Sequence, residues 1–383
     1  MRKLRVAIVA PSLDILGGQS IQADLLLRAW RDDPDVEAWL VPVNPPIPAP
    51  LRWTKRVKYL RTAATECVYI PGLLRDLRDA DLVHAFSASY WSFLLAPVPA
   101  IAAAKALGRP IVLNYHSGEA PDHLSRSAVA RSILGRVDRN VVPSNFLVRT
   151  FGQFHLAATA IPNVVDLNQF TYRERAQIAP KILSTRNFEA LYNVACTVRA
   201  FRLIQDRHPD ASLTLAGGGS REASLRQLVA VLDLRNVTFV GRVSPRRVAA
   251  LHAAHDVYLQ SPNIDNMPLS ILQAFASGLP VVTTDAGGIP DLVTHRSTGL
   301  MASVDDHQGL AAHVLEIVAN PTMASLLAQA AAHTLDQFTW EIVRPQWLRL
   351  YESVLAQSAG TLSIGIAPGV AASADGRTIG RQP

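Results

Sequence analysis

Two polar side chains, Asp265 and Gln273, stand on either side of the start of a predicted helix. The apolar runs 256–260 and 280–284 flank this segment and have the length of strands, so the pattern predicts strand, loop, helix and strand. Pro268 falls in the first turn of the helix, where a proline costs least. The two strands are expected to lie parallel in a buried sheet.

The start of this helix suits an anionic ligand. Asn266, Met267, Pro268 and Leu269 occupy the turn where a helix exposes unpaired backbone N–H groups and its positive pole. The carboxylate of Asp265 can accept hydrogen bonds from hydroxyl groups beside that pole. Together these features fit a sugar attached to a diphosphate. An ordinary loop with Asp265 and Asn266 as turn formers is the alternative.

Other candidate residues follow predicted strands. Gly17 and Gly18 come after the first strand, Arg186 ends a later one, and Gly217 and Gly218 follow the next. Glycines allow close approach of backbone to a ligand, and an arginine can donate two hydrogen bonds to a diphosphate. The glycine pair lacks the dinucleotide fingerprint Gly-x-Gly-x-x-Gly, which argues against a dehydrogenase.

Two further side chains have two interpretations each. His116 lies at the carboxyl end of the strand 110–115, where it can donate to a sugar hydroxyl, or it is a core histidine bonded to a backbone carbonyl. Arg242 follows the strand 236–241 and either adds positive charge near a nucleotide or is a solvated surface residue.

Strands and helices alternate along the chain, which predicts an α/β fold with two doubly wound halves. Predicted strands are 5–10, 36–41, 82–86, 110–115, 137–143, 181–186, 212–216, 236–241, 256–260 and 280–284. Predicted helices are 20–30, 51–68, 90–107, 145–151, 190–207, 220–232, 268–279, 308–319, 322–335 and 340–356.

Size and composition agree with this organisation. A chain of 383 residues with 49% hydrophobic and 18% charged residues supports two cores. No apolar run reaches the roughly twenty residues that cross a bilayer, and the basic, apolar start is interpreted as a first strand rather than a signal peptide, so we expect a cytoplasmic protein. Cys67 and Cys196 are too few for a disulfide framework and are expected to be buried thiols. The net charge of +6 favours anionic partners.

The stretch 51–68 is a basic amphipathic segment. Trp53, Val57, Leu60, Ala64 and Val68 share one helical stripe, and basic residues occupy the other sides. We expect this stripe to pack on the sheet of the first domain, as such stripes commonly do. The second interpretation is a peripheral contact of residues 52–61 with an anionic membrane, on the inner face of the cell membrane.

The segment from Asp265 to Gln273, with the Gly17–Gly18 loop, Arg186 and the phrase 285–291, resembles the glycosyltransferases of family 4. That resemblance covers about residues 4–355 and implies the GT-B fold, with two Rossmann-like domains facing each other across a cleft. It implies an acceptor domain at 1–170, a nucleotide-sugar domain at 180–338 and a helix at 339–357 that crosses back to the first domain. The tail 358–383 is expected to be disordered.

The resemblance also implies a retaining transfer of sugar from a UDP- or GDP-sugar to a hydroxyl of a glycan or lipid-linked acceptor, without metal or other cofactor. It implies catalytic roles for His116, Arg186 and Asp265. The donor-binding residues would be Gly17, Gly18, Gly217, Gly218, Arg242, Asn266, Met267, Pro268, Leu269 and Gln273. A nucleic-acid partner is disfavoured because basic residues outside 52–61 are dispersed.

The chain departs from the family at two places. Family members usually have glutamates where Asp265 and Gln273 stand, and many have a lysine a few residues after Arg186, where this chain reads Phe-Glu-Ala-Leu-Tyr-Asn up to Asn193. The neutral Gln273 should bind a ribose less strongly than a glutamate. An inactive homologue serving as a binding subunit and a sugar-nucleotide epimerase of the same fold are therefore alternatives. Base, sugar, acceptor and oligomeric state are left open.

Overall fold

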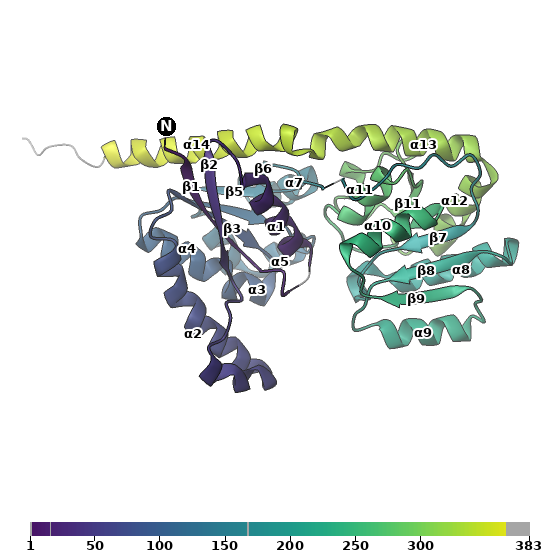
Figure 1. Ribbon diagram of the computed structural model, residues 1–383, viewed down its shortest axis with the longest axis horizontal. Helices are drawn as coiled ribbons and strands as arrows, with labels where there is room; N and C mark the ends of the chain where they lie inside the picture. The colour runs from purple at the N-terminus through teal and green to yellow at the C-terminus, as the bar shows by residue number, and fades with distance from the viewer. Residues whose placement is uncertain (1, 16, 167, 365–383) are drawn as a thin grey trace, which may run out of the picture.

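Two parallel sheets of six strands organise the computed structural model, which describes residues 2–15, 17–166 and 168–364 (Figure 1). The first sheet has the strand order β2-β1-β3-β4-β5-β6 and the second has the order β12-β11-β10-β7-β8-β9. Their inner strands, such as 82–87, 111–115 and 281–284, are short runs buried along their whole length, as strands inside a parallel sheet are. The predicted α/β fold with two doubly wound halves is therefore confirmed. The predicted boundaries, 1–170 and 180–338, enclose one sheet each, and we propose them as the two domains.

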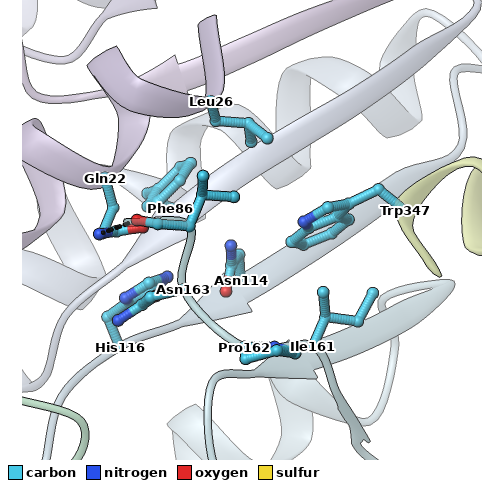
Figure 2. A pocket seen from close by; sticks show the side chains of 10 residues that line it. Gln22, Leu26, Phe86, Asn114, His116, Ile161, Pro162, Asn163 and Trp347 are labelled. Carbon is cyan, nitrogen blue, oxygen red and sulfur yellow. Dashed lines mark hydrogen bonds between the residues drawn. The ribbon is translucent and has the colours of Figure 1, made fainter. Parts of the chain in front are cut away.

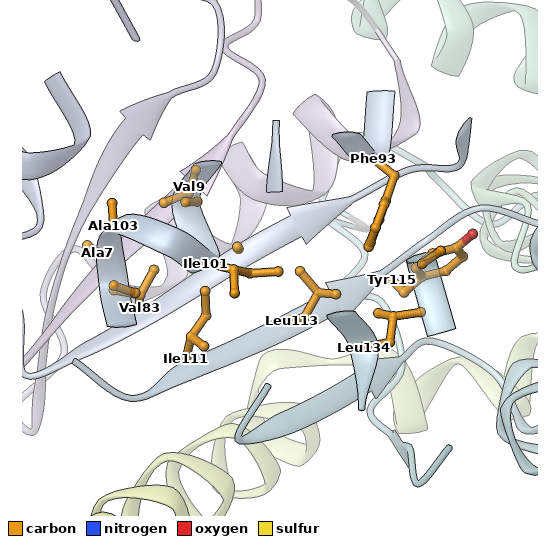
Figure 3. Close-up of a cluster of buried hydrophobic side chains, with 14 of the residues drawn as sticks. Ala7, Val9, Val83, Phe93, Ile101, Ala103, Ile111, Leu113, Tyr115 and Leu134 are labelled. Atoms are coloured by element: carbon orange, nitrogen blue, oxygen red, sulfur yellow. The ribbon is translucent and has the colours of Figure 1, made fainter. Parts of the chain in front are cut away.

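In the first half, helices of different lengths cover the sheet. Its strands are β1 (Leu4–Ala10), β2 (Val36–Pro42), β3 (Leu82–Ser87), β4 (Ile111–Tyr115), β5 (Arg139–Val142) and β6 (Thr159–Ala160). Its helices are α1 (Gly18–Trp30), the 3₁₀ helix η1 (Ala49–Arg56), α2 (Lys58–Asp76), α3 (Tyr90–Leu95), α4 (Pro97–Ala106), α5 (Ala120–Arg126), α6 (Ala128–Leu134) and α7 (Asn145–Gln153). Figure 3 shows side chains of β3, β4 and α4 meeting in one of its cores.

The second half repeats the arrangement. Its strands are β7 (Lys181–Ser184), β8 (Ser212–Ala216), β9 (Val237–Gly241), β10 (Val257–Leu259), β11 (Val281–Thr284) and β12 (Leu300–Ala302). Its helices are η2 (Ala190–Tyr192), α8 (Val194–Arg207), α9 (Glu222–Val231), α10 (Pro245–Ala254), α11 (Leu269–Ala276), η3 (Ile289–Asp291), α12 (His307–Ala319), α13 (Pro321–His333) and η4 (Thr334–Phe338).

Each sheet has a point where the strand order reverses, between β1 and β3 in the first half and between β7 and β10 in the second. Loops at the carboxyl ends of such strands diverge to opposite faces and leave space for a ligand. The loop after β1 carries Gly17, and the loops after β7 and β10 carry Arg186 and Asp265. The topology therefore places these predicted site residues at the two reversal points.

The last helix, α14 (Trp340–Ile364), packs on the first half, as predicted. The ring of Trp340 meets Trp30 edge-on at 4.6 Å, and the hydroxyl of Tyr351 lies 2.8 Å from Nδ1 of the buried His84. Arg344 donates to Asp33 at 2.5 and 3.0 Å. Burial works to raise the pKa of Asp33, but Arg344 and backbone N–H groups outweigh it and hold that pKa below its usual 3.8.

The chain crosses between the halves twice, and the two crossings touch. The backbone N–H of Val165, on the first crossing, donates to the carbonyl of Phe338, on the second, at 3.3 Å. Beyond Val165, the polar and charged segment 171–178 contains Arg175, which is only 4% exposed. Its guanidinium donates to the carbonyls of His252, His255, Ser277 and Gly278 and fixes this segment to the second half.

Three predicted helices are wrong in their extent because the backbone breaks inside them. The stretch 90–107 divides at Ala96, since Pro97 has no backbone N–H to continue the hydrogen bonds of the first helix. The stretch 190–207 divides at Asn193, which adopts a left-handed conformation with φ of 40°. α14 continues to Ile364, past the predicted end at 357, so the disorder expected for 358–383 is wrong for 358–364; residues 365–383 lie outside the described residues. Helices α5, α6 and α10 were not predicted.

The stretch 51–68 is the third divided helix. η1 ends at Arg56, Val57 is extended, and α2 begins at Lys58 and continues to Asp76. The expected packing of the stripe on the sheet is wrong for Trp53, Val57 and Leu60, which are 60%, 48% and 44% exposed. The core contact comes later in α2, from Tyr69 and Leu73. Cys67 is exposed on this helix, which corrects the expectation of two buried thiols.

By length and apolar composition, no single helix in the described part of the chain is suited to crossing a membrane. α12 and the following stretch Pro321–Ser358 pass that test only as a pair, bent by 105°.

Candidate active site

A buried ion pair lies at the reversal point of the second sheet. Arg186, just beyond β7, donates from Nη2 to Oδ2 of Asp265, in the loop after β10. The two side chains are 10% and 12% exposed. Nη1 of Arg186 donates to the hydroxyl of Ser270 at 3.3 Å, in the first turn of α11. The predicted proximity of Arg186, Asp265 and the start of this helix is therefore observed.

The charges of this pair depend on each other. Burial raises the pKa of the Asp265 carboxyl, and the guanidinium of Arg186 opposes that rise. Burial also works to lower the pKa of Arg186, but Asp265, Tyr192 and Tyr258 together outweigh it, so the arginine pKa is raised and its positive charge is kept. Nε of Arg186 is buried without a hydrogen-bond partner among the described residues. The guanidinium therefore retains unused hydrogen-bonding capacity.

A glycine pair shapes the loop that carries Asp265. The N–H of Gly288 donates to the Asp265 carbonyl at 3.0 Å. A Cβ on Gly287 would lie 2.1 Å from that carbonyl oxygen, and a Cβ on Gly288 would lie 2.2 Å from the carbonyl oxygen of Asn266. Gly287 also has a φ of 56°, which side chains rarely allow. The phrase 285–291 therefore needs glycine at both positions to hold Asp265 in place.

The helix start predicted to bind an anion is present, with small differences. α11 begins at Leu269, and Pro268 is the residue before its first turn rather than within it. Met267 and Leu269 are partly exposed and Asn266 is buried. Gln273 lies one turn beyond Leu269 and is partly exposed. The amide nitrogen of Asn266 is buried without a partner among the described residues, which leaves one more donor beside Asp265.

The second glycine loop lies against Arg186. A Cβ on Gly217 would stand 2.0 Å from the Arg186 carbonyl oxygen, so no larger residue fits there. A Cβ on Gly218 would stand 3.3 Å from the side chain of Arg242. The structure thus places Gly217 against Arg186 and the next residue, Gly218, against Arg242. Arg242 is exposed, so both of its interpretations stay open.

The first half contributes two loops that meet at Ser87. The carbonyl of Ser87 accepts from the backbone N–H of His116 at 3.0 Å and from the side chain of Gln19 at 2.8 Å. Gln19 directly follows Gly17 and Gly18, and a Cβ on either glycine would meet nothing within 4 Å. The glycine loop therefore lies beside the His116 loop and borders open space.

His116 points into a small polar cavity with room for little more than one water molecule. Figure 2 shows Gln22, His116 and Asn163 on one side of it and Trp347 on the other. Nε2 of His116 and Oδ1 of Asn114 are buried without partners in the described part of the chain. Burial lowers the pKa of His116 to about 4, so the ring is neutral at pH 7. The alternative interpretation of His116, a core histidine hydrogen-bonded to a backbone carbonyl, is not supported at Nε2, which has no such bond in the described part of the chain.

The two halves touch at the loop that carries Asp265. A Cβ on Gly118, two residues after His116, would lie 3.1 Å from the carbonyl carbon of Asp265. The hydroxyl of Ser144 donates to Oδ1 of Asn266. The carboxylate of Asp291 accepts from the N–H of Phe146 at 2.6 Å. The predicted site residues of both halves therefore border one junction.

Sequence reasoning missed several side chains of this region. Ser144 caps α7 by accepting from the N–H of Leu147 at 3.3 Å, and its bond to Asn266 across the junction has no local signal in the sequence. Tyr192 was noted only as part of a Tyr-Asn phrase, and its ring lies on the guanidinium of Arg186. Such contacts depend on tertiary structure, which periodicity does not reveal.

Comparison with known proteins identifies the family. A model described as Glycosyltransferase Family 4 matches residues 16–169, and one described as Glycosyl transferases group 1 matches residues 170–334. The two matches together cover residues 16–334, which include every described strand except β1. The chain belongs to glycosyltransferase family 4.

Relatives with curated functions have diverged far in sequence. A glycogen synthase of Mycobacterium tuberculosis is 28% identical over 288 residues, which cover 71% of this chain and 68% of the relative. A phosphatidyl-myo-inositol mannosyltransferase of Mycolicibacterium smegmatis is 23% identical over 377 residues, or 92% and 94% of the two chains. The crystal structure of Anabaena HepE with UDP and glucose covers 94% of this chain and 100% of its own, with a TM-score of 0.68 and 18% identity, and supports the GT-B fold.

Membership makes this family 4 protein an enzyme that transfers a sugar from a nucleotide-diphosphate donor. Among the described residues, no group of three or more His, Cys, Asp or Glu side chains is arranged to hold a metal ion. The expected independence of metal stays a prediction.

Proposed function

We propose that this glycosyltransferase moves a sugar from a UDP- or GDP-sugar to a hydroxyl of a lipid-linked or glycan acceptor, with retention of the anomeric configuration. The single observation that carries this proposal is the buried pair of Arg186 and Asp265 at the start of α11. It places a fixed cation and a hydroxyl acceptor side by side, as a sugar diphosphate requires.

In this proposal the second half holds the donor. Arg186 and the N–H groups at the start of α11 take the diphosphate, which gains negative charge as the bond from the sugar C1 to the diphosphate oxygen breaks. Asp265 accepts hydrogen bonds from sugar hydroxyls. The loop of Gly217 and Gly218, with Arg242, borders the nucleotide, and Gln273 contacts the ribose.

The first half presents the acceptor. Gly17 and Gly18 leave room for the diphosphate and acceptor at the junction, and the neutral His116 donates one hydrogen bond to the sugar. The acceptor oxygen bonds to C1 on the face that the diphosphate leaves, and its proton passes to the departing phosphate oxygen. No side chain is then needed as a general base.

A panel of UDP, GDP and ADP tests donor binding. The correct nucleotide should raise the melting temperature of the wild-type protein by mass action. Arg186→Lys should reduce that shift because one ammonium cannot reproduce the fork of a guanidinium. Arg202→Lys is the matched control, since Arg202 forms a half-exposed pair with Asp206 on α8. A melting temperature unchanged by all three nucleotides would contradict the proposal.

A membrane-bound acceptor is supported by the surface of η1 and α2. We define the α2 surface as Trp53, Val57, Tyr59, Leu60, Ile70 and Leu74, all at least 44% exposed. Arg52, Arg56 and Arg61 are exposed in the same segment. Figure 1 shows α2 extending away from the first sheet. Apolar residues beside arginines match the chemistry of an anionic lipid surface, and the mannosyltransferase relative is named for a phosphatidylinositol acceptor.

Vesicle sedimentation tests this contact. The protein should bind vesicles of phosphatidylglycerol more strongly than those of phosphatidylcholine, and salt should weaken the binding. Trp53→Ser should weaken it by roughly tenfold, because one interfacial tryptophan contributes on the order of 1–2 kcal/mol. Val231→Ser, at a 74% exposed position on α9, is the control. Equal loss in both variants, or no binding to either lipid, would exclude the α2 surface as the membrane contact.

A further inference from the structure

Tyr192 covers the guanidinium of Arg186. The centre of its ring lies 4.0 Å from Cζ of Arg186, the distance of a close cation–π contact. The ring itself is half-buried and packs against the core of the second half. The ring therefore covers one face of the guanidinium, and the N–H groups of Arg186 donate their hydrogen bonds in the plane of the guanidinium.

The segment that carries Tyr192 is fixed to the loop that carries Asp265. The carbonyl of Leu191 accepts from the N–H groups of Asn263 at 2.8 Å and Ile264 at 3.3 Å. The side-chain amide of Asn193 donates to Asn263 at 2.9 Å and to Asp305 at 2.9 Å. These bonds bring Tyr192 and Asp265 to the same cation from two different loops.

The turn after Tyr192 explains why asparagine follows it. Asn193 has a φ of 40° and a ψ of 47°, a left-handed conformation in which asparagine is tolerated far better than most residues. Its Oδ1 also accepts from the N–H of Cys196 at 3.3 Å and caps α8. The Tyr-Asn phrase therefore has two parts: Asn193 makes the turn, and Tyr192 reaches the guanidinium.

We propose that Tyr192 is a positioning residue that orients Arg186 for the donor diphosphate. With the ring on one face, Asp265 and Ser270 accept from Nη2 and Nη1 of the guanidinium. Nε is buried and stays without a partner among the described residues. A guanidinium held in one orientation loses less freedom when it binds a diphosphate. The inference rests on the proposed donor site.

Isothermal titration with UDP, GDP and ADP tests this role in four variants. Tyr192→Phe keeps the ring and should bind the preferred nucleotide within twofold of wild type. Tyr192→Leu keeps bulk but loses the aromatic face, and its Kd should rise about 5- to 20-fold, the range of a desolvated cation–π contact. In an Arg186→Lys background, Tyr192→Leu should add less than twofold, because Tyr192 acts through the guanidinium.

Three results would overturn the inference: Tyr192→Leu binding within twofold of wild type, Tyr192→Phe losing as much as Tyr192→Leu, or additive losses in the double variant. A wild-type protein that binds none of the nucleotides contradicts the donor site itself. In that case urea unfolding still tests whether Tyr192 contacts Arg186. If the ring contacts the guanidinium, the changes in unfolding midpoint caused by Tyr192→Leu and Arg186→Lys should not add in the double variant. Additive changes would exclude the contact.

Discussion

The carboxylate of Asp265 has two proposed roles: it is the counter-charge of Arg186, and it accepts hydrogen bonds from sugar hydroxyls. Replacing Asp265 by asparagine removes the charge and keeps an acceptor. The variant keeps the size of the side chain but removes the negative charge that faces Arg186. Because both side chains are about nine-tenths buried, the remaining guanidinium is left without a counter-charge. Removing one partner of a buried pair costs about 3–5 kcal/mol, and the amide oxygen recovers about 1 kcal/mol as a neutral acceptor. We expect a loss of roughly 2–4 kcal/mol in the free energy of unfolding.

The same change should strengthen the binding of a free nucleoside diphosphate. In the wild-type protein, Asp265 already neutralises Arg186, so a diphosphate has to share that cation. In Asp265→Asn the diphosphate becomes the counter-charge, and its affinity should rise by about tenfold, or 1.4 kcal/mol. Transfer of sugar should fall by about 100-fold or more, because the acceptor of sugar hydroxyl bonds is weakened.

Urea unfolding and calorimetric titration with the preferred nucleotide measure both effects. Asp206→Asn is the matched control, since Asp206 forms a half-exposed pair with Arg202 and should change the unfolding free energy by less than about 1 kcal/mol. If Asp265→Asn weakens the nucleotide instead, or leaves unfolding unchanged, Arg186 is not the cation shared between the two ligands.

Three further outcomes follow from the geometry. Gly118→Ala should lower transfer at least tenfold, because its Cβ would press on the Asp265 loop across the junction; Gly152→Ala, where a Cβ meets nothing within 4 Å, should match wild type in the same rate assay. Asp33→Asn should lose about 2 kcal/mol of stability at pH 7. Because the Asp33 pKa is lowered on folding, that difference should vanish as the pH falls below 3.8, and a constant difference in urea titrations down to pH 3 would contradict it. Gln273→Glu should lower the donor KM several-fold through a charge-assisted bond to ribose, and an unchanged KM would place Gln273 away from the donor.

The sequence predicted the architecture because its signals are local. Buried parallel strands are continuous apolar runs, and the glycine and arginine positions follow those runs directly, so Arg186 and Asp265 were expected at one edge. Their ion pair was not expected, because it joins residues whose strands, β7 and β10, become neighbours only through the order of the second sheet.

Errors arose where a single residue interrupts a regular pattern. Pro97 divides a predicted helix because it has no backbone N–H, and Asn193 divides another by taking a left-handed conformation. The stripe through Trp53 has helical spacing, but spacing alone does not say whether an apolar face meets the protein or a different partner. The arginine at 175 has no periodic signal, and only the folded chain shows why it is buried.

The bond between Val165 and Phe338 has a mechanical consequence. Two connecting segments that touch at one point restrict the rotation of one half relative to the other more than a single connection does, because each limits the rotation that the other permits. We therefore expect the two halves to open and close about one axis through this contact. Binding of the nucleotide in the second half and entry of the acceptor in the first half would then depend on the same movement.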